Sequence, residues 1–269
     1  MLTVGVGGFG KAKLTTYKGK KAVVKYLNVN DSPEATFATC TINREAAKKE
    51  GEIMKLFENS DYLAQMYAIE GHAIYMKYYE KGSLRDLIDK GGAEKGRYWG
   101  AFRICCGLSK IHRLNFVHSD LKASNILVDT NPKAENSLLC CISDFGAARL
   151  NGSMPIACTP GFYPPDFFKR PVRFEDDIYA LGKLFIELFG RIKDVSYIDY
   201  NNFNTVMKQS FFTDEWNVCQ EEPKTYSFSL DLMNLVHECL NENPKKRPIL
   251  GHFKGIFYSW LYFKIKHSE

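Results

Sequence analysis

The sequence His118-Ser119-Asp120-Leu121-Lys122-Ala123-Ser124-Asn125 decides the fold of this chain, together with Asp144-Phe145-Gly146, which begins nineteen residues after Asn125. Apolar runs at 126–128 and 138–142 read as strands, so the polar side chains beside them belong on short loops held by rigid elements. One carboxylate of such a cluster can take a proton from a substrate hydroxyl. The other, with the asparagine oxygen, can hold magnesium, a hard cation that prefers oxygen ligands and substrate phosphates.

The two segments resemble the catalytic loop of eukaryotic-type protein kinases, H-R-D-L-x-x-x-N, and the D-F-G that follows it. The resemblance implies that Asp120 orients the acceptor hydroxyl and takes its proton, and that Lys122 reaches the γ-phosphate of ATP. It also implies that Asn125 and Asp144 hold Mg²⁺ across the phosphates. His118 is interpreted as a structural residue whose hydrogen bonds are met inside the fold.

Ser119 departs from the family pattern, because an arginine is expected at its position. In many of these kinases that arginine needs a phosphorylated loop to neutralise it. The loop after Asp144 also carries few hydroxyls, among them Ser153 and Thr159. These residues predict activity that does not require loop phosphorylation.

Near the N-terminus, Gly5, Gly7 and Gly10 fit the pattern G-x-G-x-x-G. Dinucleotide-binding folds share this pattern, but they need a helix directly after the glycines. Here two strand-like segments flank a Lys18-Gly19-Lys20 turn, which predicts a hairpin instead. The resemblance then implies a loop that covers nucleotide phosphates, formed by Gly5, Val6, Gly7, Gly8, Phe9 and Gly10.

Lys25 ends the segment Ala-Val-Val-Lys, which resembles the V-A-I-K of the third kinase strand. The resemblance implies that Lys25 binds the α- and β-phosphates and that Ala12 and Ala22 are the small residues above the adenine. Kinases also pair this lysine with a glutamate on the next helix, expected here over about 42–57.

The glutamate should be followed one helical turn later by an apolar residue, which packs behind the Asp144 motif. Glu45 is followed by a lysine, whereas Glu50 is followed by Met54 and Glu52 by Leu56. The sequence therefore leaves two candidates, of which Glu52 is favoured and Glu50 is the alternative.

Residues 74–84 resemble the kinase hinge, where two lobes meet. On this resemblance Met76 guards the back of the adenine pocket, and Lys77 and Tyr79 offer backbone groups to the adenine. Leu127, after the catalytic loop, completes the predicted nucleotide contacts. Ser83 is expected to cap a helix that begins at Leu84.

Further motifs follow in the order found in kinases. Thr159 and Asp166 lie in segments similar to G-T-P-x-F/Y and A-P-E, and Asp166 is expected to pair with Arg247 of a late arginine motif. Asp177 opens a segment to about 189 that is apolar on nearly every side, which indicates a buried helix. The resemblance implies that Asp177 holds the backbone of the catalytic loop.

Composition excludes several classes of protein. The 269 residues carry a net charge of +5 without a clustered basic patch, so no nucleic-acid partner is expected. The apolar run 255–263 is too short to span a bilayer, so no membrane insertion is expected. The eight cysteines form no Cys-x-x-Cys pair, which favours reduced thiols in an intracellular protein, cytosolic or nuclear.

The sequence as a whole predicts one α+β domain over 1–269 with two lobes. A small β-rich lobe with one long helix covers about 1–78, a hinge about 77–82, and a larger, mainly helical lobe about 83–269. The predicted function is ATP- and Mg²⁺-dependent transfer of the γ-phosphoryl group to Ser/Thr hydroxyls of a protein substrate. The alternatives are a pseudokinase that serves as a nucleotide-binding scaffold, and a small-molecule kinase of related fold.

Overall fold

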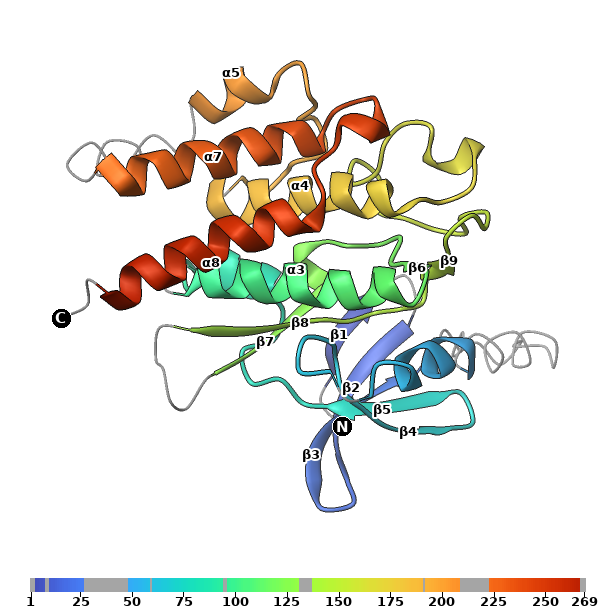
Figure 1. Cartoon of the computed structure of the whole chain (residues 1–269). Coiled ribbons are helices and arrows are strands. Elements are labelled where there is room, and N and C mark those ends of the chain that lie inside the picture. Colours follow the sequence, from blue (N-terminus) through green and yellow to red (C-terminus); the bar gives the residue numbers. More distant parts are fainter. Residues whose placement is uncertain are drawn as a thin grey trace.

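The computed structural model describes residues 3–7, 10–26, 48–58, 60–93, 96–130, 137–190, 192–208 and 223–266. In this part of the chain a sheet-rich first lobe is followed by a larger, mainly helical lobe (Figure 1). The predicted two-lobed α+β architecture is therefore confirmed. No helix among the described residues combines the length and the apolarity that crossing a bilayer requires.

The first lobe contains an antiparallel sheet of five strands in the order β1–β2–β3–β5–β4. The strands are β1 Thr3–Gly7, β2 Gly10–Tyr17, β3 Lys20–Tyr26, β4 Met66–Glu70 and β5 Ala73–Lys77. The predicted hairpin is present, and its turn residues Lys18 and Gly19 have φ values of 47° and 79°. Two consecutive positive φ values match the right-handed twist of the flanking strands, so this turn fits a tight hairpin.

The helix predicted over about 42–57 is described at 48–55, and its earlier residues lie outside the described part. It lies close to the sheet at Gly51, where any side chain would collide with Ile69 of β4. Met54 and Phe57 are buried, and the ring of Phe57 lies 5.4 Å from that of Phe145 in the D-F-G segment. The first lobe is thereby packed directly against the candidate site.

The second lobe is built around helices and two short strand pairs. The helices are α2 Leu84–Asp89, α3 Arg97–Arg113, α4 Phe174–Gly190, α5 Phe203–Lys208, α7 Pro223–Cys239 and α8 Leu250–Lys266. The strand pairs are β6 Phe116–Val117 with β9 Arg149–Leu150, and β7 Ile126–Thr130 with β8 Leu138–Ile142. Single 3-10 turns lie at Ala123–Asn125, Phe167–Lys169 and Pro244–Lys246.

Helix α2 begins where the sequence predicts. The Ser83 hydroxyl accepts a hydrogen bond from the Asp86 N–H, and the Asp86 carboxylate accepts one from the Ser83 N–H. This reciprocal pair satisfies two N–H groups that a helix start otherwise leaves without partners.

Helix α4 is the centre of the second lobe. Every residue from Asp176 to Gly190 is buried, as its apolar sequence predicts. It packs against α7, while α3 packs against both α8 and β8 (Figure 1). One face of α3, formed by Ile104, Leu108 and Ile111, is fully buried. These helices fix the loops on which the polar cluster lies.

Candidate active site

Asp177, near the start of α4, holds the loop that contains His118 and Ser119. Its Oδ2 accepts hydrogen bonds from the His118 N–H at 2.8 Å and pairs with His112 Nε2 at 2.9 Å. Its Oδ1 accepts from the Ser119 N–H at 3.1 Å and from the Tyr163 hydroxyl at 3.0 Å. Burial alone would raise the pKa of Asp177, but His112 and these donors outweigh it, so the pKa is lowered. The predicted role of Asp177 is confirmed.

Two residues of the site, one in this loop and one in the D-F-G segment, have an unusual backbone conformation. Ser119 and Asp144 have φ values of 67° and 63°, in the left-handed region that residues other than glycine rarely adopt. His118 is fully buried, with Nε2 3.0 Å from the Ser143 carbonyl oxygen, and its Nδ1 accepts the Asp120 N–H at 3.3 Å. The interpretation of His118 as structural is therefore confirmed.

Asp120 lies at the centre of a group of polar side chains. The Thr159 hydroxyl donates to Asp120 Oδ1 at 2.6 Å, and Lys122 Nζ lies 2.9 Å from Asp120 Oδ2 and 2.5 Å from Thr159 Oγ1. Asn125 Nδ2 donates to the Asp120 carbonyl and to Oδ2, at 2.7 and 3.0 Å. Thr159 belongs to a segment far from Asp120 in the sequence. The fold therefore brings the Thr159 motif and the catalytic loop together.

The residues predicted to hold magnesium fit that ion by their chemistry. The side-chain N–H groups of Asn125 donate to Asp120, so the side-chain oxygen of Asn125 is the atom left to bind a cation. Asp144 is partly open to solvent, with its side chain 26% exposed. Among the described residues no group of three or more His, Cys, Asp or Glu could hold a metal ion. Two protein oxygen donors suit magnesium, which usually keeps water and substrate phosphates as its other ligands.

Lys25 connects the sheet to this site. Its Nζ lies 2.7 Å from Asp144 Oδ1 and 2.8 and 3.0 Å from the two carboxylate oxygens of Glu50. Burial alone would lower the pKa of Lys25, but the two carboxylates outweigh it and the pKa is raised. The same ammonium lowers the pKa of Asp144 against the opposing effect of burial. Lys25 is therefore charged and Asp144 ionised at neutral pH.

The prediction that Glu52 is the partner of Lys25 is wrong. Glu52 has a side chain 59% exposed and lies 4.0 Å from Lys48 on its own helix. Glu50 is the partner, and Met54, one turn after it, is buried, whereas Leu56 is 56% exposed. The expected apolar residue one turn on is present, but both candidates satisfied that rule in the sequence. Helix phase against the sheet decides between them.

The strand register also contradicts the prediction for one of the two small residues expected above the adenine. Successive side chains of a strand point to opposite faces, and directly paired residues share a face. Lys25 pairs with Ala12, and Val23 pairs with Met76, so these four side chains share one face of the sheet. Ala22 lies on the opposite face and is fully buried. The prediction that Ala22 shares the face of Lys25 above the adenine is therefore wrong, and Val23 is the residue of β3 that lies on that face.

The glycine pattern lies between two antiparallel strands. Gly5 pairs with Ala12, and Gly7 pairs with Gly10 across β1 and β2. Gly8 and Phe9 lie outside the described residues, and so do the side-chain surroundings of Val6. Because the strand that begins at Gly10 pairs with β1 and no helix follows the glycines directly, the dinucleotide-binding arrangement is excluded.

Comparison with known proteins agrees with this geometry. The model of the protein kinase domain family matches residues 1–255. The chain belongs to the protein kinase family. It is 26% identical to the serine/threonine-protein kinase Nek3 of Mus musculus over 273 aligned residues, which cover 91% of this chain and 46% of that relative. The chain thus spans about half the length of the curated relative it matches.

In the hinge of this kinase domain, several backbone groups are already used. The Lys77 N–H donates to the Gln65 carbonyl at 3.0 Å, so the prediction that Lys77 offers a backbone group narrows to its carbonyl. The backbone carbonyl of Tyr79 accepts a hydrogen bond from the Gly82 N–H. The side chain of Tyr79 is buried, and its hydroxyl accepts one from the Gln65 N–H. Leu127 pairs with Cys141 on β8 and forms an isolated bridge with Ser83.

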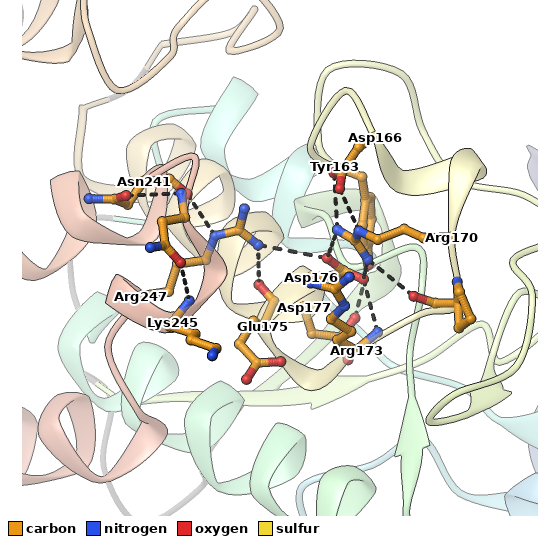
Figure 2. A network of polar contacts seen from close by, with 12 residues as sticks. Tyr163, Asp166, Arg170, Arg173, Glu175, Asp176, Asp177, Asn241, Lys245 and Arg247 are labelled. Carbon is orange, nitrogen blue, oxygen red and sulfur yellow. Dashed lines mark hydrogen bonds and ion pairs between the residues drawn. The ribbon is translucent and has the colours of Figure 1, made fainter.

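The late arginine of the kinase domain does not pair with Asp166. Asp166 instead accepts hydrogen bonds from Arg170 at 2.5 and 3.0 Å. Arg170 in turn binds Asp176, as Figure 2 shows. Arg247 donates to the Glu175 carbonyl at 2.8 Å and lies 3.7 Å from Asp176. The predicted Asp166–Arg247 pair is therefore wrong. Arg170, four residues after Asp166, reaches the short carboxylate and joins it to the buried Asp176.

Sequence reasoning missed Tyr163 and Val23. Tyr163 follows the Thr159 motif and reads as an ordinary apolar position, so nothing in the sequence marks its hydroxyl. Val23 could have been found, because it lies two residues before Lys25 and strand alternation puts the two on one face.

Proposed function

We propose that this domain is an ATP-dependent serine/threonine-protein kinase that uses magnesium and acts on a protein substrate. The observation that carries the proposal is the group formed by Asp120, Lys122 and Thr159. A lysine two residues after the aspartate and a threonine bound to both resemble serine/threonine kinases. The similarity to a relative that is named a serine/threonine-protein kinase supports the same conclusion.

The proposed mechanism assigns positioning and charge to the protein, because phosphoryl transfer asks it for little covalent work. Asp120 accepts the proton of the incoming hydroxyl, which replaces the Thr159 or Lys122 contact at its carboxylate. Lys122 then moves its charge toward the transferred phosphoryl group. Lys25, fixed by Glu50, binds the α- and β-phosphates.

Asn125 and Asp144 would hold magnesium, which neutralises the charge of the phosphates. Ala12, Val23, Met76, Tyr79 and Leu127 would surround the adenine, and Lys77 would bind it through its carbonyl. The glycine loop Gly5, Val6, Gly7, Gly8, Phe9 and Gly10 would cover the phosphates with backbone N–H groups. The lobes would meet in the segment 77–82.

We further propose that the enzyme works without phosphorylation of the segment between Asp144 and Asp166. Ser119 is buried, and its hydroxyl donates to the Val117 carbonyl at 3.5 Å. Because a serine is uncharged, this position holds no positive charge that a loop phosphate would need to neutralise. An intracellular location is supported by six free thiols in the described part of the chain.

One assay tests the enzyme. Wild type and Asp144→Asn are incubated with labelled ATP, magnesium and a generic basic protein, and the labelled amino acid is identified. We expect label on serine or threonine with wild type only. Nucleotide binding without transfer by wild type would contradict the proposal and favour a scaffold.

Phosphorylation independence needs a separate measurement. Protein treated with phosphatase should transfer phosphate at the rate of untreated protein. If the treated protein were inactive and recovered only after autophosphorylation, this part of the proposal would be wrong.

A further inference from the structure

Tyr163 connects three parts of the candidate site through one hydroxyl group. The hydroxyl donates to Asp177 Oδ1 at 3.0 Å and accepts the Leu121 N–H at 3.1 Å (Figure 2 includes Tyr163 and Asp177). Tyr163 is 6% exposed, and Leu121 and Asp177 are fully buried. The bridge therefore lies away from water, where a hydrogen bond that loses its partner is costly.

The position of Tyr163 in the chain gives this bridge a consequence for the reacting groups. Tyr163 lies four residues after Thr159, whose hydroxyl contacts Asp120 and Lys122. Leu121 lies between Asp120 and Lys122 in the catalytic loop. One hydroxyl thus binds the segment that presents Thr159 to the loop that presents both catalytic side chains.

Packing alone does not require the hydroxyl. The Tyr163 ring lies 4.6 Å from that of Phe167, and a phenylalanine could fill the same space. Without the hydroxyl, however, the Leu121 N–H would be buried with no acceptor, and Asp177 would lose one of its donors. Burial also raises the pKa of Tyr163, which keeps the hydroxyl protonated as a donor.

We propose that Tyr163 is a positioning residue that fixes the Thr159 segment against the catalytic loop and so replaces the contact that other kinases build from an arginine and a loop phosphate. This inference rests on the proposed kinase function and explains how Ser119 is compatible with it. The contact is built into the fold, because both of its partners are backbone or buried groups that no modification changes.

The test compares wild type with Tyr163→Phe, which removes only the hydroxyl. Tyr258→Phe on α8, where Tyr258 is 66% exposed, is the matched control. We expect kcat to fall about tenfold to a hundredfold in Tyr163→Phe, the size expected for a buried hydrogen bond to a charged group. KM for ATP should stay within about twofold, because nucleotide contacts are unchanged. A variant that is less stable but turns over at the wild-type kcat would overturn the proposal.

Hydrogen exchange reads the same contact without any catalysis. The Leu121 amide should exchange at least about tenfold faster in Tyr163→Phe than in wild type or the Tyr258→Phe control. Unchanged protection at Leu121 would overturn the positioning role, whatever the activity. A wild type that transfers no phosphate but shows the expected exchange difference would instead contradict the proposed function and leave the bridge standing.

Discussion

The Lys25 ammonium lies 2.8 Å from Glu50 Oε1, while Glu52, two residues further along the same helix, points to solvent. Lys25 is 8% exposed and Glu50 is 2% exposed, so the pair is removed from water. In such a pair each charge depends on the other, because an unpaired buried charge is strongly unfavourable.

This arrangement predicts different outcomes for two similar substitutions. Glu50→Gln should lower kcat/KM for ATP about tenfold or more, because Lys25 loses the group that orients it toward the phosphates. Glu52→Gln should leave kcat and KM for ATP within about twofold of the wild-type values, as expected for an exposed charge. Steady-state kinetics of the two variants decide the matter, and equal losses would show that Glu50 does not fix Lys25.

The network around Asp176 predicts a second contrast. Asp166 is largely exposed, so Asp166→Ala should lower the free energy of unfolding by about 1 kcal/mol or less. Arg170 is bound to the fully buried Asp176 at 2.7 Å, so Arg170→Met should cost about 3 kcal/mol or more. Urea denaturation at neutral pH measures both values. A larger loss for Asp166→Ala would instead support a structural pair at that residue.

The corrections at Glu50 and Arg170 show which parts of the fold and the site could be predicted from the sequence. The apolar composition of α4 on nearly every side located this helix, because a helix buried all round is apolar all round. The partner of Lys25 depended on helix phase, which Gly51 and Ile69 set through contact between distant segments. The prediction for Asp166 was wrong for a similar reason. The sequence contains both Arg170 and Arg247, and only the fold determines which of them binds Asp166.

Other parts of the site were within reach of the sequence. Strand alternation from Lys25 leads to Val23 without any tertiary information. Asp120, Lys122 and Asn125 share one short loop, so their proximity follows from chain connectivity alone. Tyr163 could not be found in this way, because the partners of its hydroxyl lie on two other segments. Helix α5 lies in a stretch without apolar periodicity, and its existence depends on packing.

Asp177 predicts the behaviour of the fold in acid. Its folded-state pKa lies below the ordinary value of 3.8, so ionised Asp177 stabilises the fold above that pH. The contribution is lost as the pH falls through the folded pKa. Asp177→Asn should therefore lose about 3 kcal/mol or more at neutral pH, and the difference from wild type should shrink below about pH 4. Chemical denaturation at both pH values measures it, and a difference that grows in acid would contradict the assignment.

Lys183 predicts a pH dependence of the same sign in alkali. It is 1% exposed on α4, and its ammonium donates to the carbonyl oxygens of Val195, at 2.7 Å, and Ile198. Burial lowers its pKa from 10.5 to about 8, although Asp199 and Asp194 oppose the change. Between these two pH values the unfolded chain keeps a proton that the folded chain releases. The free energy of unfolding should therefore rise with pH across this window, by on the order of 3 kcal/mol from this group.

Lys183→Met isolates that contribution. The variant leaves two carbonyl groups without their donor, which lowers its stability at every pH, but it removes the titrating group. Its stability curve should therefore lack the rise that wild type shows between about pH 8 and 10.5, while the titrations of tyrosines and cysteines affect both proteins alike. Urea denaturation of the two proteins at matched ionic strength gives the two slopes. Parallel curves would mean that Lys183 keeps its ordinary pKa inside the fold, and that its two carbonyl partners stabilise the ammonium as well as water does.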